Sequence, residues 1–282
     1  MSGITTTERP LDLSLSESEL EAHREQITDF IATQFEAAGA DTAVIALSGG
    51  IDSTLTAHLA VEALGSDSVY GLVLPTEVNR AENMSDAERV AADLLDIDYD
   101  VVEIGPVVDA IVEAAPGTDA AEAPADEAER LAVGNTRARV RSVFNYFVAN
   151  RDGGLVLGTG NKSEALVGYF TKYGDGAVDC LPIANLYKQQ VRQLARHVGV
   201  PEDLASKTAS AELWADQTDE EELGVGYDTL DAVLALHVDG PLSVSATARH
   251  LDVEEGLVER VREMYERSAH KRAFPPGPEP LY

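Results

Sequence analysis

The chain has 282 residues, and 44% of them are hydrophobic, which is enough for the core of one large α/β domain. Its 50 acidic and 21 basic residues give a formal net charge of −29, and this balance argues against nucleic-acid binding through a basic face. The only cysteine, Cys180, excludes an intramolecular disulfide and a paired-cysteine motif. We expect a cytoplasmic protein without membrane contact, because no apolar run approaches the roughly 20 residues of a membrane span and the polar N-terminus does not resemble a secretory leader.

In chain order, residues 1–18 come first and are expected to form a flexible arm. Short apolar runs predict strands at 43–47, 69–74, 99–104 and 155–157, and a fifth short strand around Ile183. Apolar residues at helical spacing predict helices at 19–38, 53–64, 83–95, 130–149, 187–197, 227–237 and 254–268. Segments 113–130 and 205–222 are expected to be mobile loops, the first because it is rich in Ala, Asp, Glu and Pro.

This alternation of strands and helices predicts an α/β fold, with a doubly wound parallel five-stranded sheet flanked by helices. We expect residues 19–282 to form a single domain whose C-terminal part is helical. Ligands bind such sheets at the carboxyl ends of the strands. The loops at 48–53, 75–80 and 159–164 should therefore converge on one site.

The loop after the first strand has the composition of a nucleotide site. Its residues lie between a buried strand and a helix and are Leu47, Ser48, Gly49, Gly50, Ile51, Asp52 and Ser53. Backbone N–H groups and the helix dipole favour a phosphate here, the glycines leave room for it, and the serines add hydroxyl donors. Asp52 would repel phosphate unless a divalent cation lay between them, which predicts Mg-ATP. The alternative is an ordinary tight turn with a serine cap. No Gly-Lys-Ser/Thr follows, so this is not a Walker A loop.

A second polar loop, residues 159–164, follows the fourth predicted strand. Glu164 begins a helix there and is the candidate second carboxylate for a magnesium ion held by Asp52. The alternative for Glu164 is an acid favoured at a helix N-terminus by the dipole alone. Further on, the run Gly168–Gly176 packs aromatic residues, glycines and Lys172 closely together, as in a pocket that stacks a flat ring and binds charged groups around it.

Charged residues carry a further signal. Only five of the 21 basic residues are lysines, and an acidic, lysine-poor composition is typical of proteins from salt-loving organisms. Acidic blocks such as residues 219–222 are interpreted as solvated surface. Because lysine is scarce, each one present is expected to have a specific role, and phosphate binding would suit compact ammonium groups. The lysines are Lys162, Lys172, Lys188, Lys207 and Lys271.

Taken together, the motifs resemble those of ammonia-dependent NAD synthetases, in consistent order from about residue 20 to 274. The loop at 48–53 resembles the pyrophosphate loop of the wider adenine nucleotide α-hydrolase-like superfamily, whereas the string Phe-Thr-Lys-Tyr-Gly-Asp-Gly at 170–176 is nearly private to this family. The other matching segments are 134–139, 158–164, 185–188, 217–224 and 270–272.

The resemblance implies a reaction. ATP activates the carboxylate of nicotinic acid adenine dinucleotide (deamido-NAD) as an acyl-adenylate, and ammonia then displaces AMP to give NAD, with pyrophosphate as the other product. Mg²⁺ and a homodimer are implied as well. Only about 40 residues precede the first strand, which leaves no room for the amidase domain of glutamine-dependent relatives. Free or partner-delivered ammonia is therefore expected to be the nitrogen source.

The resemblance also implies roles for individual residues, by their positions in the matching motifs. The resemblance implies that ATP is contacted by residues 47–53 and by Arg80, Thr159, Lys188 and Ser210. Asp52, Lys188 and Ser210 would be catalytic, and Asp52 and Glu164 would hold the metal. The implied dinucleotide contacts are Arg139, Phe170, Lys172, Asp175, Asp179, His270 and Lys271. For Arg137 and Arg141, a salt-bridge role is as plausible as a ligand role. Ala209 and Glu212 depart from the family pattern around Ser210 and leave the geometry of that loop open.

Three other functions remain open from the sequence. A GMP-synthetase-like amination and a tRNA thiolation share the first loop, although thiolation usually needs paired cysteines and a basic RNA surface. A non-catalytic nucleotide sensor would need the loop at 48–53 but not Glu164, Lys172, Asp175 and Lys188 together.

Overall fold

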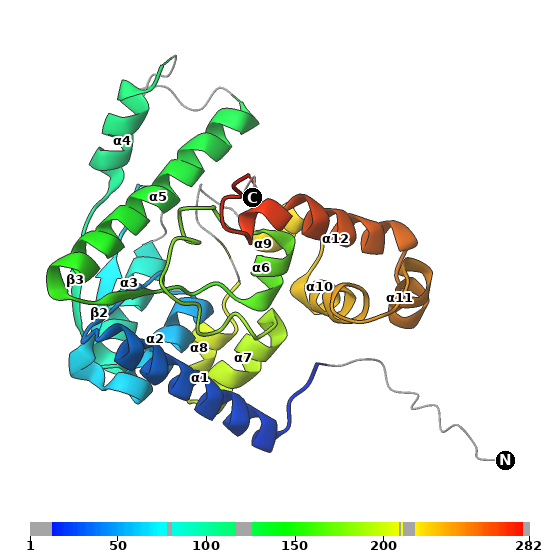
Figure 1. The fold of residues 1–282 in the computed structure, drawn as a ribbon, viewed down its shortest axis with the longest axis horizontal. Coiled ribbons are helices and arrows are strands. Elements are labelled where there is room, and N and C mark those ends of the chain that lie inside the picture. The colour runs from blue at the N-terminus through cyan, green and yellow to red at the C-terminus, as the bar shows by residue number, and fades with distance from the viewer. Residues whose placement is uncertain (1–12, 78–80, 117–125, 209, 211–217, 279–282) are drawn as a thin grey trace.

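A parallel sheet lies at the centre of the computed structural model, which describes residues 13–77, 81–116, 126–208, 210 and 218–278 (Figure 1). Its strand order is β3-β2-β1-β4, and every neighbouring pair is parallel. The strands are β1 (Ala43–Ala46), β2 (Val69–Val73), β3 (Asp98–Val101) and β4 (Leu155–Leu157). β1 is a central strand, so the loop that follows it lies where the strand order reverses, at the place where open α/β sheets bind ligands.

Helices cover both faces of the sheet, as the sequence predicts. Successive strand residues point to opposite faces, and β1 shows this because Ile45 belongs to one buried cluster and Val44 to another. The helices on the Ile45 face include α1 (Glu17–Ala38), α2 (Ile51–Leu64) and α7 (Lys188–His197). Those on the Val44 face are α4 (Gly105–Ala114) and α5 (Glu127–Asp152).

The predicted fifth strand is wrong, because the sheet in the described ranges has four strands. Cys180 forms a single parallel bridge with Leu157, and the chain then leaves the sheet. Pro182 has no N–H to continue a ladder, and the residues that follow form turns, with Leu186 N–H donating to the carbonyl of Ile183 at 3.1 Å. Ile183 is fully buried in the core, which explains its strand-like apolar character.

Residues 13–18, the described part of the predicted arm, contact the body of the protein. Leu15 N–H donates to Gln193 Oε1 on α7 at 2.8 Å, and Ser16 caps α1. The predicted acidic loop is also shorter than expected, because α4 continues to Ala114 and α5 begins at Glu127, capped by Asp126. Residues 1–12 and 117–125 lie outside the described ranges. In the predicted loop at 205–222, the described part includes the helix α9 (Asp219–Leu223).

The C-terminal part is helical, as predicted, and has a hydrophobic core of its own. It includes α10 (Tyr227–Val233), α11 (Val244–Leu251) and α12 (Glu255–Arg267), which lie across the molecule from β3 (Figure 1). Val167, at the end of α6 (Lys162–Val167), joins this core and connects it to the loop after β4.

The remaining elements are short. They are α3 (Ala81–Arg89), α8 (Glu202–Ala205), 3-10 turns at Ser66–Ser68 and Ala269–Lys271, and π-helical turns at Val90–Leu94 and Leu234–Val238. Among the helices of the described ranges, none has the combination of length and apolar character that crossing a membrane requires.

Candidate active site

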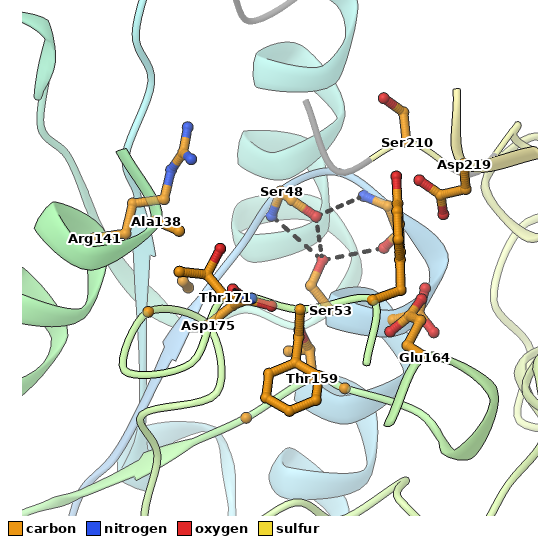
Figure 2. Close-up of a pocket in the computed structure, with 18 of the residues that line it drawn as sticks. Ser48, Ser53, Ala138, Arg141, Thr159, Glu164, Thr171, Asp175, Ser210 and Asp219 are labelled. Atoms are coloured by element: carbon orange, nitrogen blue, oxygen red, sulfur yellow. Dashed lines mark hydrogen bonds between the residues drawn. The ribbon is translucent and has the colours of Figure 1, made fainter. Parts of the chain in front are cut away.

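A cavity of about 550 Å³ opens at the carboxyl ends of β1 and β4. The loops at 48–53 and 159–164 both line it, which confirms that they converge. In Figure 2, Ser48 and Ser53 lie between Thr171 and Asp175 on one side and Glu164 and Asp219 on the other. Of the predicted third loop, the described residues Pro75, Thr76 and Glu77 line a neighbouring, more open hollow that shares Met84 with the cavity. Arg80 lies outside the described ranges.

The loop after β1 is held by its own serines. The two hydroxyls of Ser48 and Ser53 lie 3.1 Å apart, Gly50 N–H donates to Ser48 Oγ at 3.3 Å, and Ser53 Oγ donates to the carbonyl of Gly50 at 3.1 Å (Figure 2). Gly50 is the N-cap residue of α2. Because glycine has no side chain, the first N–H groups of this 14-residue helix have no side-chain cap. The helix therefore presents its dipole and N–H groups to the cavity, which is the arrangement that binds phosphate.

Packing against α3 requires a glycine at position 49. Its φ is +73°, and a Cβ at this position would lie 2.3 Å from the carbonyl oxygen of Asn83 on α3. At Gly50, a Cβ would meet only Ser48 Oγ, at 3.3 Å. Lys207 also connects this loop to α3, because its ammonium donates to the carbonyl of Gly49 at 3.3 Å and forms an ion pair with Asp86 on α3.

Asp52, Glu164 and Lys188 meet at the floor of the cavity. Lys188 Nζ lies 2.5 Å from Asp52 Oδ2 and 3.2 Å from Glu164 Oε1. Asn161 adds an amide hydrogen bond to Asp52 Oδ1 at 2.9 Å, and its side chain also caps α6 by accepting from the N–H of Glu164. The three charged groups therefore come from the ends of β1 and β4 and from the start of α7.

Burial controls the electrostatics of this cluster. Only 2% of Lys188 is exposed. Burial by itself lowers the pKa of its ammonium, but the carboxylates of Asp52 and Glu164 outweigh that effect and hold the pKa above its usual value. Burial raises the pKa of Glu164, with Lys188 acting in the opposite direction. A buried ion pair of this kind needs all its partners, because removal of one leaves an uncompensated charge.

The two carboxylates fit a magnesium ion only together with a ligand. In the described ranges, no group of three or more His, Cys, Asp or Glu side chains could hold a metal by itself. Asp52 and Glu164 supply two hard oxygen ligands beside the phosphate cradle, and Mg²⁺ commonly binds through one or two carboxylates plus phosphate oxygens and water. In this structure the ammonium of Lys188 supplies the positive charge between them.

The predicted dinucleotide contacts fall into two groups. Phe170, Asp175 and Lys271 line the cavity. Asp175 is exposed, and its Oδ1 accepts the N–H of Thr171 at 2.8 Å. Lys271 Nζ donates to the carbonyls of Gly168 and Phe170 at 2.7 and 2.8 Å and so ties the C-terminal segment to this loop.

Among the described residues, the other four predicted dinucleotide contacts do not line the cavity and have local partners. Lys172 Nζ donates to the carbonyls of His270 and Ala273, and Arg139 donates to the carbonyl of Lys172 at 3.3 Å. Asp179 accepts the N–H of Val156 on β4 at 2.7 Å and the hydroxyl of Tyr146 at 3.2 Å, so it holds its segment against the sheet.

For Arg137 and Arg141 on α5, the sequence allowed either a ligand role or a salt-bridge role. Arg137 forms an ion pair with Glu77 at 2.7 Å, whereas Arg141 lines the cavity and donates to the carbonyl of Leu74 at 3.1 Å. Asn135 also lines the cavity and accepts the hydroxyl of Thr171 at 2.7 Å. Thr159 and Ser210, predicted to contact ATP, both line the cavity as well (Figure 2).

Sequence reasoning missed Asp219, Tyr227 and Asp231. The acidic block at 219–222 is not simply solvated surface, because Asp219 is 3% exposed and accepts the hydroxyl of Tyr227 at 2.9 Å. Glu222 accepts the hydroxyl of Tyr169 at 2.7 Å, and both Asp219 and Glu222 line the cavity. Burial raises the pKa of Asp219. The local sequence carries no signal for this, since an acidic run at a helix N-terminus is usual on surfaces as well.

The sequence is similar to known proteins over most of its length. A family model described as NAD synthase matches residues 23–275. The chain is 60% identical over 272 residues to the NH(3)-dependent NAD(+) synthetase of Halobacterium salinarum, covering 96% of this chain and 98% of that protein. It is 45% identical to the protein of the same name from Hyperthermus butylicus, covering 90% and 89%.

Solved structures of two synthetases are also similar to this chain. The NMN synthetase from Francisella tularensis superposes with a TM-score of 0.78 at 32% identity, covering 94% of this chain and 99% of that one. The NH3-dependent NAD synthetase from Campylobacter jejuni superposes with a TM-score of 0.75 at 30% identity, covering 92% and 99%.

Proposed function

The chain belongs to the NAD synthase family, and we propose that it is an ammonia-dependent enzyme that amidates deamido-NAD to NAD at the expense of ATP. The observation that carries this proposal is a phosphate cradle at Ser48–Ser53 in one cavity with two partly buried carboxylates and a buried ammonium. The chain is also 60% identical to an NH(3)-dependent NAD(+) synthetase.

The chemistry explains why ATP is split between its α and β phosphates. A carboxylate resists ammonia because it is anionic and its leaving group would be oxide. The nicotinate carboxylate attacks the α-phosphorus of ATP, the bond to the β-phosphate oxygen breaks, and pyrophosphate leaves with the electron pair. Ammonia then attacks the acyl carbon of the adenylate, AMP departs, and the nitrogen loses a proton to give the amide.

The residues around the cradle have distinct roles in this proposal. The loop at 47–53 binds the leaving pyrophosphate through backbone N–H groups and the serine hydroxyls. Lys188 moves from its carboxylate partners toward the phosphates and stabilises the charge that develops on them. Thr159 contacts ATP near the phosphates, Ser210 contacts it near the α-phosphate, and Arg80 contacts the adenosine. Mg²⁺, held by Asp52 and Glu164, would neutralise phosphate charge when bound.

The other end of the cavity suits the nicotinate dinucleotide. Phe170 offers a ring for stacking, and Asp175 and Lys271 lie beside it. We propose that Arg139, Lys172, Asp179 and His270 contact the remainder of the dinucleotide, with Lys172 exchanging its carbonyl partners for the substrate. Asp179 has a second role on this view, since its hydrogen bond to Val156 fixes the loop to β4.

We also propose a homodimer. Val143 and Phe147, one turn apart on α5, are 67% and 65% exposed, and the neighbouring α4 exposes Val107 and Ile111. Adjacent apolar side chains of this size are typical of surfaces that a partner covers. The acidic, lysine-poor composition and the Halobacterium relative support adaptation to high salt. The cytoplasmic location stays a prediction.

One assay tests the proposed function. The purified protein is incubated in molar KCl with Mg-ATP, ammonium and deamido-NAD, and the products are separated by chromatography. We expect NAD, AMP and pyrophosphate in equal amounts. AMP without NAD would contradict the proposal and favour another amination or a thiolation, and binding without turnover would favour a sensor.

A second acceptor belongs in the same assay because the chain resembles an NMN synthetase at a TM-score of 0.78. Nicotinate mononucleotide carries the same carboxylate without the adenylate half. We expect a lower kcat/KM for it than for deamido-NAD, since the curated relatives at 60% and 45% identity are both named NAD synthetases. The reverse order would make NMN the product.

A further inference from the structure

Asp231 is a fully buried carboxylate on α10, a helix of the C-terminal part. Its Oδ1 accepts the hydroxyl of Ser163 at 2.5 Å, and its Oδ2 accepts the N–H of Gln189 at 2.9 Å. Ser163 lies in the first turn of α6 and Gln189 in the first turn of α7. One side chain of α10 therefore holds the starts of two helices that are distant in sequence.

Ser163 connects Asp231 to the backbone of α7, and we call the contacts among Asp231, Ser163, Lys188 and Gln189 the junction. Its hydroxyl oxygen donates to Asp231 and also accepts the N–H of Lys188 at 2.9 Å. Lys188 and Gln189 are the first two residues of α7, and N–H groups at this position have no partner inside the helix. Both are satisfied here by the junction, and the negative charge of Asp231 suits the helix N-terminus. The position of the α7 backbone at Lys188 is thus set by Ser163 and Asp231.

The junction lies directly behind the charged cluster of the cavity. Ser163 precedes Glu164, and the N–H that it receives belongs to Lys188, whose ammonium lies 3.2 Å from Glu164 Oε1. Tyr227, one turn before Asp231 on α10, faces the same pair. Its hydroxyl lies 3.5 Å from Glu164 Oε1, and its ring centroid lies 5.1 Å from Lys188 Nζ.

We propose that Asp231 is a positioning residue for the adenylation step: by joining Ser163 to the start of α7, it fixes the spacing of Lys188 and Glu164. This inference rests on the proposed function. Groups that act on phosphates must be held to a fraction of an ångström, and their supporting shell has to be rigid. A carboxylate that served only the stability of the fold would leave the kcat of the folded enzyme unchanged.

The test compares four variants. Asp231→Asn keeps the size of the side chain, but it has one acceptor oxygen where the carboxylate has two. Ser163→Ala removes the shared hydroxyl, and a third variant combines both changes. Asp228→Asn is the matched control, because Asp228 lies on the same helix with a side chain that is 81% exposed and only a 3.4 Å contact to Arg192.

We expect Asp231→Asn to lower kcat by about 10- to 100-fold at saturating substrates, with KM for deamido-NAD changed by no more than about twofold. Ser163→Ala should lower kcat as well, and the double variant should be no slower than Asp231→Asn, because both changes break one junction. Asp228→Asn should match the wild type. A wild-type kcat in Asp231→Asn, or losses that multiply in the double variant, would overturn the inference.

A second measurement does not depend on turnover. Acetic anhydride labels lysines according to their exposure and charge, and peptide mass spectrometry reports each lysine separately. In Asp231→Asn, Lys188 should react faster than in the wild type, whereas Lys162 should not change. Unchanged labelling of Lys188 would overturn the inference. If Asp231→Asn does not fold, by circular dichroism, then the kcat and labelling of Ser163→Ala decide. A wild type that makes no NAD would contradict the proposed function, and the labelling would still decide the positioning role.

Discussion

The ammonium of Lys188 lies 2.5 Å from the carboxylate of Asp52, although 136 positions separate the two residues in the sequence. Glu164 shares the same ammonium at 3.2 Å. In the proposed function, a nucleotide and its metal would separate these charges, with Lys188 pairing with phosphate and the carboxylates pairing with the metal. Such an exchange would account for a cationic and two anionic groups beside the same cradle.

Asp52→Asn should lower the rate of NAD formation roughly 100-fold or more, because an amide neither pairs with the ammonium of Lys188 nor gives Mg²⁺ an anionic oxygen. Steady-state kinetics with saturating ATP measure the effect. Asp67→Asn is the control, since Asp67 is exposed just beyond the other end of α2. Near-normal turnover of Asp52→Asn would refute both the metal and the catalytic role of this residue.

Gly49→Ala should destabilise the protein more than Gly153→Ala, although both glycines have positive φ, of +73° and +68°. Gly153 has open space around its Cβ position, so alanine costs only the strain of a left-handed residue, about 1–2 kcal/mol. At Gly49 the new methyl would lie 2.3 Å from the carbonyl of Asn83, which adds about 1–3 kcal/mol of overpacking.

Urea unfolding of both glycine variants measures the difference in the free energy of unfolding. KM for ATP should rise in Gly49→Ala alone, because the shift displaces the cradle, whereas Gly153 lies at the end of α5. Equal destabilisation by the two variants would show that α3 does not constrain this loop.

The cradle was predictable from sequence because its signals are local. A buried strand, glycines and a helix start follow one another within residues 43–64, and each element formed close to its predicted bounds. The scarcity of lysine was a further signal, and three of the five lysines, Lys188, Lys207 and Lys271, line the cavity.

What failed depended on tertiary contacts. Ile183 has the apolar character of a strand, but the Pro182 before it interrupts pairing, and the side chain is buried in the core without a ladder. Asp219 has the character of a surface acid, yet Tyr227 buries it. Asp231 sits in an unremarkable helical sequence, and only the fold brings it to Ser163. The local sequence pattern does not predict these contacts, because each depends on residues that are distant in the sequence or on the packing of separate elements.

The free energy of unfolding should rise with KCl concentration. A net charge of −29 repels itself in the folded state, and the screening length shortens from about 10 Å at 0.1 M salt to about 3 Å at 1 M. Urea titrations at a series of KCl concentrations measure this, with circular dichroism as the signal. Stability that does not change with salt would contradict the halophilic interpretation of the composition.

Acidification should destabilise the protein through His58. Burial lowers the pKa of this histidine below 6.5, with the nearby Arg24 acting in the same direction, and its Nδ1 is buried without a hydrogen-bond partner. The unfolded chain then binds a proton more readily than the folded one, so stability is lost as the pH falls below 6.5. His58→Gln should lose less stability than the wild type over this range. His250→Gln, at an exposed histidine, should follow the wild type, and parallel curves for all three proteins would refute the role of His58.

Phe147→Glu should convert the proposed dimer to a monomer. Phe147 and Val143 present apolar surface on α5, and a carboxylate placed at the centre of a subunit interface would lose its hydration without gaining a partner. Size-exclusion chromatography with light scattering in molar KCl measures the mass. Phe274→Glu is the control, because Phe274 is 95% exposed and lies outside α4 and α5. A wild-type monomer, or a Phe147→Glu variant that remains dimeric, would show that this face is not the interface.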